Sequence, residues 1–149
     1  MKPVRTWIVV SDGGEARILL NEGPGRGVTE MEGMAFQADH PPNRDINADK
    51  PGRAFDSAGT GRHAKEPPSD PHRMEKKKFA GKISKILEAG LRKKNFDRLV
   101  LVASPAMLGD LREGLSSQLA SLVAAEINKD LTHKNAAQLA QHLGSVLIL

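Results

Sequence analysis

The chain has no cysteine and no tyrosine, and its aromatic residues are one tryptophan and four phenylalanines among 149 residues. Without cysteine there is no disulfide framework, no thiolate nucleophile and no cysteine-ligated zinc site, which fits a reducing compartment. The shortage of aromatic side chains leaves little material for the base-stacking platforms of single-strand nucleic-acid binders. These absences exclude several common classes of site before any motif is considered.

Long apolar runs are missing as well. The apolar stretch near the N-terminus, residues 7–10, is too short for a signal peptide or a membrane span. The sequence therefore predicts a cytoplasmic protein without a membrane partner. A formal net charge of +4 permits contact with RNA or another polyanion without requiring it.

The strongest structural signal is the run of five apolar residues at 99–103. It has no polar alternation, which is typical of a strand buried on both faces in the interior of a sheet covered by helices. Residues 4–11 predict a similar strand beside it, followed by a hairpin turn at Asp12, Gly13 and Gly14. Two more strands are expected at 15–21 and at 28–36, the second at an edge protected by glutamates.

The second half of the chain alternates helices and strands. Asp70 and Pro71 predict the start of a helix that ends near residue 94, and Ser104 with Pro105 begins another. Residues 122–128 predict a returning parallel strand, and Asn135 caps a last helix. The order β-β-β-α-β-α-β-α predicts a single α/β domain over 1–149, a three-layer ribonuclease H-like fold with a mixed five-stranded sheet.

One long loop, residues 37–69, interrupts this pattern. It lacks periodicity and is rich in Pro, Gly, Asp, Asn and Arg. A structureless stretch of this length is uncommon in a compact domain and is usually functional or disordered. We therefore expect the loop to be the main functional element.

Basic residues of this loop and of the helix after it form the predicted RNA- or phosphate-binding set. Arginine matches phosphate geometry with paired donors, and helix N-termini favour anions. Acidic residues are interspersed, so internal ion pairs within the loop are the competing interpretation. The predicted set is Arg44, Arg53, Arg62, His63, His72, Arg73, Lys76 and Lys77.

Catalytic and metal sites have weaker support. Asp12 ends the first strand and could hold metal ions together with Glu75, but the strand ending at Ala103 lacks the third acid of a two-metal nuclease. No histidine spacing matches a metal motif. The sequence thus predicts no catalytic residue, metal or cofactor, and Asp12 as a turn residue. A hydrolase, either nuclease or peptidyl-tRNA-type, centred on Asp12, His63 and His72 is the alternative.

Several short motifs together resemble one family, the bacterial host attachment proteins, which are similar to the middle domain of eukaryotic-type peptide chain release factors. They include Val10-Ser11-Asp12, Asp49-Lys50-Pro51-Gly52-Arg53, Asp70-Pro71-His72-Arg73, Phe96-Asp97-Arg98-Leu99-Val100-Leu101 and Lys129-Asp130-Leu131-Thr132-His133. The resemblance implies a release-factor-like fold and contact with the ribosome or structured RNA. The Gly-Gly-Gln tip of release factors is absent, and Gly59-Thr60-Gly61-Arg62 stands in its place.

We therefore expect a non-catalytic RNA- or ribosome-associated module. A protein-interaction module that affects attachment to host cells indirectly is the second alternative. The apolar C-terminus, which finishes in Ile148 and Leu149, also predicts a homodimer through the C-terminal helix, unless it folds back onto its own sheet.

Overall fold

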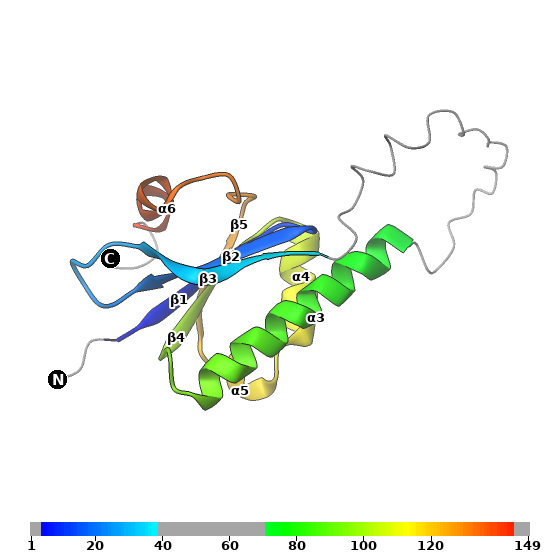
Figure 1. Ribbon diagram of the computed structural model, residues 1–149, viewed down its shortest axis with the longest axis horizontal. Coiled ribbons are helices and arrows are strands. Elements are labelled where there is room, and N and C mark those ends of the chain that lie inside the picture. The colour runs from blue at the N-terminus through cyan, green and yellow to red at the C-terminus, as the bar shows by residue number, and fades with distance from the viewer. Residues whose placement is uncertain (1–3, 39–70, 145–149) are drawn as a thin grey trace, which may run out of the picture.

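A five-stranded mixed sheet forms the centre of the molecule (Figure 1). In the computed structural model, the residues described are 4–38 and 71–144, without the side chains of 71 and 72. The strand order is β3-β2-β1-β4-β5, with β2 antiparallel to both its neighbours and β4 parallel to both of its own. The strands are β1 (Thr6–Ser11), β2 (Glu15–Asn21), β3 (Thr29–Gln37), β4 (Arg98–Ala103) and β5 (Val123–Asn128). The predicted element order and the mixed sheet are confirmed.

Helices cover both faces of this sheet. The long α3 (Pro71–Arg92) packs on one face with α4 (Pro105–Gly114) and the short α5 (Ser117–Ala120), and α6 (Ala136–Leu143) packs on the other. The predicted cap of the last helix is confirmed, because Asn135 and Gln138 form a reciprocal capping box. None of the helices in the described part is long and apolar enough to cross a membrane.

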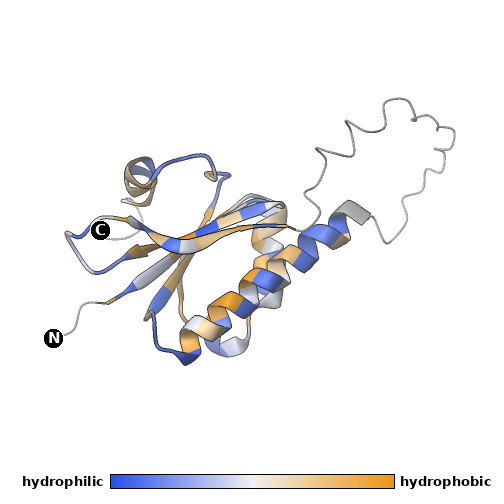
Figure 2. Ribbon diagram, in the orientation of Figure 1, coloured by the Kyte–Doolittle hydropathy of each residue, from blue (hydrophilic) through white to orange (hydrophobic). Residues whose placement is uncertain are grey.

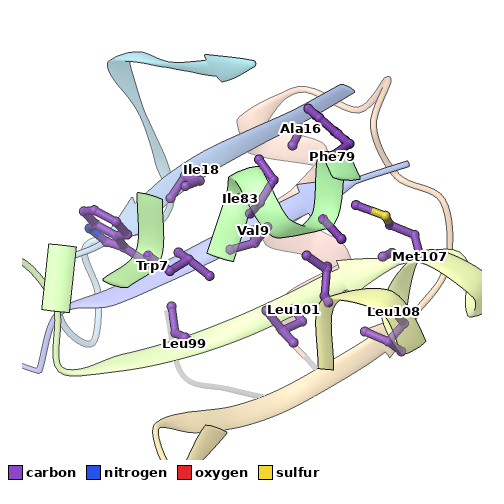
Figure 3. Packing of buried hydrophobic residues seen from close by; sticks show 14 of the residues in the cluster. Trp7, Val9, Ala16, Ile18, Phe79, Ile83, Leu99, Leu101, Met107 and Leu108 are labelled. Atoms are coloured by element: carbon purple, nitrogen blue, oxygen red, sulfur yellow. The ribbon is translucent and has the colours of Figure 1, made fainter. Parts of the chain in front are cut away.

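The larger core lies between the sheet and α3, α4 and α5 (Figure 3). Alternate residues of each strand point to this side, because strand side chains alternate between faces. The Trp7 ring lies 4.7 Å from the Phe96 ring, centroid to centroid, and packs so closely on α3 that a Cβ on Gly90 would approach it to 2.6 Å. The principal members of this core are Trp7, Val9, Ile18, Phe79, Ile83, Leu87, Leu99, Leu101, Met107 and Leu111.

A smaller core fills the opposite face. There α6 and the segment before it contribute Leu131, Leu139 and Leu143, which pack against strand residues such as Val10 and Val102. Every residue of β1 is buried, and so are five of the six in β4. The prediction that both strands lie inside the sheet is therefore confirmed. Residues 145–149, on which the dimer prediction rests, are outside the described residues.

The edge strand β3 is irregular. Its pairing with β2 shifts register between Arg17 and Leu19, and Gly33 adopts a positive φ of 77° there. Glu30 and Glu32 are exposed, as predicted for a protected edge. Four predicted elements differ from the structure by one or two residues. The strand β1 begins at Thr6, β3 lies one residue later than predicted, and β5 begins at Val123. The helix α3 ends at Arg92 because Lys94 takes up a left-handed conformation with a φ of 58°.

Candidate nucleic-acid interface

Positive charge is concentrated on α3. The helix has seven lysines and arginines against two glutamates, an excess of five, whereas the whole chain has a net charge of +4. Five of these cations are exposed, and four of the five follow one another at intervals of four, three and seven residues, so these four share one side of the helix, away from the buried core residues. We call this set the basic stripe: Lys78, Lys82, Lys85 and Arg92. Figure 2 shows hydrophilic and apolar residues interleaved along α3.

Little within the described residues neutralises the basic stripe. The Lys78 ammonium is 4.0 Å from a Glu75 carboxylate oxygen, and Lys82 donates a long hydrogen bond of 3.4 Å to the Gln37 carbonyl. Lys85 has no ion-pair or hydrogen-bond partner in the described part of the chain, nor does Lys77 on the neighbouring side of the helix. An exposed ion pair at such a distance contributes little. The stripe is therefore available to an external anion.

The first turns of α3 are held by polar contacts. The Arg73 guanidinium donates two hydrogen bonds to the Asp110 carboxylate of α4, at 2.8 and 2.5 Å, and the Asp110 side chain is only 3% exposed. The Lys76 methylenes lie across Gly13, where an added Cβ would approach them to 2.8–2.9 Å. No residue from 73 to 78 is a buried apolar one, and Met74 is 51% exposed. Arg73, Lys76 and Lys77 are thus brought together here, but Arg73 is already paired.

The two ends of the predicted loop attach beside these turns. The Ala38 amide donates to the Gly14 carbonyl at 2.9 Å, which fixes the end of β3 to the β1–β2 turn against which Lys76 lies. On the other side of the loop, α3 starts at Pro71. The predicted residues Arg44, Arg53, Arg62 and His63 lie outside the described residues, and so does the side chain of His72. Their role as RNA ligands stays a prediction.

The Asp12 carboxylate is hydrogen-bonded within the turn between β1 and β2. One carboxylate oxygen accepts hydrogen bonds from the Gly14 and Glu15 amides at 2.7 and 2.8 Å, which confirms the turn interpretation. The other oxygen lies 3.5 Å from the Thr132 hydroxyl. Across residues 4–38 and 73–144, no group of three or more His, Asp or Glu side chains is placed to hold a metal ion. The alternative hydrolase site also needs His63 and the side chain of His72, which lie outside the described residues, so it stays a prediction.

A polar cluster that the sequence did not predict lies next to Asp12. Arg17 donates to the carbonyls of Thr132 and Lys134 and to the Glu30 carboxylate, while the Thr132 hydroxyl donates to Asp130 at 2.7 Å. These bonds fix residues 129–134 across the end of β1. Asp130 and Thr132 are typical turn residues, but nothing in the sequence near them indicates a partner more than a hundred residues away.

A second ion pair on α4 offers a contrast with Arg73 and Asp110. Arg112 donates from Nε to both Glu126 oxygens, at 2.9 and 3.0 Å, in a more exposed position. The hydrogen bonds from Arg112 lower the pKa of Glu126 from its ordinary value, and partial burial opposes them. This pair joins α4 to β5 and leaves the basic stripe untouched.

The opposite end of the sheet has an open depression whose charges largely pair with one another. Arg5 contacts Asp97 at 3.6 Å, and Arg26 contacts Glu22 at 3.9 Å. Its lining residues are Val4, Arg5, Glu22, Arg26, Leu91, Lys94, Phe96 and Asp97. It is less suited to a polyanion than the basic stripe, because both of its acidic residues lie beside its cations.

The chain matches the model of a known protein family. Residues 7–143 match the model of the family described as "Protein required for attachment to host cells". The chain belongs to that family. A search of curated proteins finds no match. The family match spans all of the sheet except Thr6, and it includes α3 and the basic stripe, so these features are part of the matched domain.

Proposed function

We propose that this host attachment protein is a non-catalytic, cytoplasmic module that binds structured RNA or the ribosome. The observation that carries the proposal is the basic stripe, whose exposed cations have few partners among the described residues. Arg44, Arg53 and Arg62, which lie outside the described residues, stay predicted RNA ligands. Attachment to host cells would then depend on the protein indirectly.

The distribution of aromatic residues favours contact with the phosphate backbone. In the part of the chain that the structure describes, Trp7, Phe79 and Phe96 are buried and Phe36 is partly buried against the core, while Phe55 lies outside that part. Lysines without exposed aromatic neighbours neutralise phosphates but do not stack on unpaired bases. We therefore expect binding to double-helical RNA with little sequence preference.

The topology supports the same proposal. Three strands in an antiparallel meander continue into two parallel strands, β4 and β5, through helical crossovers. This is the order expected for a ribonuclease H-like fold. We infer that the domain is related to the middle domain of release factors, which would be consistent with a ribosomal partner.

The test is fluorescence anisotropy with a short labelled RNA hairpin. We expect Lys82→Gln with Lys85→Gln to weaken binding and to reduce the slope of log K against log salt by about 1.4–1.8, the effect of losing two phosphate contacts. The matched control is Lys129→Gln with Lys134→Gln, which removes the same charge from exposed positions away from the stripe. Equal losses in both double variants, or no binding by the native protein, would contradict the proposal.

A further inference from the structure

The first turns of α3 depend on one ion pair for their position. Apolar packing of this helix begins at Phe79, and the residues before it contribute no buried apolar side chain among 73–78. The helix extends beyond the ends of the strands at this point (Figure 1). The polar and close contacts that join these turns to the described part of the domain include the Lys76 contact with Gly13 and the bidentate Arg73–Asp110 pair.

The geometry makes Arg73 a poor candidate for a phosphate ligand. Both of its terminal nitrogens already bond to Asp110, and the carboxylate is almost completely shielded from water. Removing Arg73 from Asp110 would leave a buried unpaired charge, which is costly. An RNA phosphate would therefore have to compete with a pre-formed, partly desolvated carboxylate.

We infer that Arg73 and Asp110 are positioning residues for RNA binding: the pair fixes the first turns of α3, with Lys77 and Lys78, and the point where residues 39–70 rejoin the domain. This inference rests on the proposed function. It gives Arg73 a different role from the predicted one of a phosphate ligand. It also assigns a role to Asp110, a buried acid on a different helix that would never touch RNA.

The direction in which one substitution changes the RNA affinity distinguishes a positioning role of Arg73 from a phosphate-binding role. Asp110→Asn removes a negative charge and releases the Arg73 guanidinium. If Arg73 bound phosphate once it was released from Asp110, this variant would bind the RNA hairpin more tightly. We expect instead that it binds about fivefold more weakly, the cost of ordering one or two additional interface side chains. Its salt slope should equal that of the native protein, because no phosphate contact is lost.

A double-variant cycle checks the coupling. Adding Arg73→Gln to Asp110→Asn should cause no further loss of affinity, since both residues act through one pair. A further loss, or tighter binding by Asp110→Asn alone, would overturn the inference. The double variant also leaves no buried unpaired charge, so it can be studied if either single variant fails to fold.

Hydrogen exchange tests the same idea without RNA. In Asp110→Asn we expect faster exchange at the amides of residues 74–78, with those of 83–92 unchanged. Unchanged exchange at 74–78 would overturn the inference even if RNA binds. If exchange responds as expected but the native protein binds no hairpin, the anchoring is supported, and both the proposed function and the role of the pair in RNA binding are wrong.

Discussion

The two parts of α3 are stabilised in different ways. From Phe79 onward, the helix buries a continuous apolar side that includes Ile83 and Leu87 against the sheet. Before Phe79, it is joined to the described domain by a salt bridge and by the methylenes of Lys76. The turns before Phe79 thus have no buried apolar side, whereas the part from Phe79 onward has a buried apolar side and, on its exposed side, three of the four cations of the basic stripe.

From Phe79 onward, the buried side of α3 contributes to folding, and the opposite, exposed side carries the lysines proposed to bind RNA. Burial of apolar area is the dominant favourable term in folding, so substitutions of the buried apolar residues of α3 should act mainly on the free energy of unfolding. Substitutions of exposed lysines should act mainly on RNA affinity. The predictions below test the two parts in order of decreasing effect on stability.

The largest loss is expected for Leu87→Ala, because Leu87 is fully buried in the larger core. Removing such a side chain costs about 2–5 kcal/mol of unfolding free energy. Met74→Ala in the first turns is the matched control and should change stability by about 0.5 kcal/mol or less. Urea unfolding followed by the fluorescence of Trp7 measures both. Similar losses in the two variants would contradict the comparison.

Two glycines sharpen the contrast. Alanine at Gly90 would place its Cβ 2.6 Å from the rigid Trp7 ring, and we expect a loss of about 1–2 kcal/mol after the gain in helix propensity. Alanine at Gly13 would meet only the flexible methylenes of Lys76, at 2.8 Å. It should change stability by about 0.5 kcal/mol or less. The same unfolding measurement applies, and a larger effect at Gly13 would show that Lys76 is rigidly held.

The smallest effect concerns the exposed ion pair of α4. The pKa of Glu126 is lowered in the folded protein, so its contribution to stability is present above the ordinary pKa of glutamate and is lost as pH falls through the lowered value. We expect the stability difference between the native protein and Glu126→Gln to be small at neutral pH and to vanish in acid. Thermal unfolding across this pH range measures it; a difference that grows on acidification would contradict the assignment.

Much of the fold could be predicted from local patterns. The uninterrupted apolar run 99–103 predicted a strand inside the sheet, and Asn135 with Gln138 predicted the cap of α6, because each signal depends on residues close in sequence. The partners of Arg73 and Arg17 could not be predicted. Asp110 is 37 residues from Arg73, and the carbonyls bound by Arg17 lie 115 and 117 residues away, so only the folded sheet brings them together.

The predicted binding set did not include any of the four residues of the basic stripe, although the sequence places lysines along this helix. Composition indicated a basic helix, and the spacing of Lys78, Lys82 and Lys85 follows from the helical repeat. Whether a given cation is already paired depends on tertiary contacts, which is why Arg73 was expected to bind phosphate. The arginines of residues 39–70 lie outside the described residues, and their role remains a prediction.

The RNA that co-purifies with the protein tests the central claim most directly. The native protein is isolated from cells at low and at high salt, and the bound nucleic acid is extracted and sequenced. Binding through phosphate contacts predicts structured RNA, ribosomal RNA above all, in the low-salt sample and its steep loss at high salt. A protein that is free of RNA at low salt, or that retains only protein partners, would contradict the account.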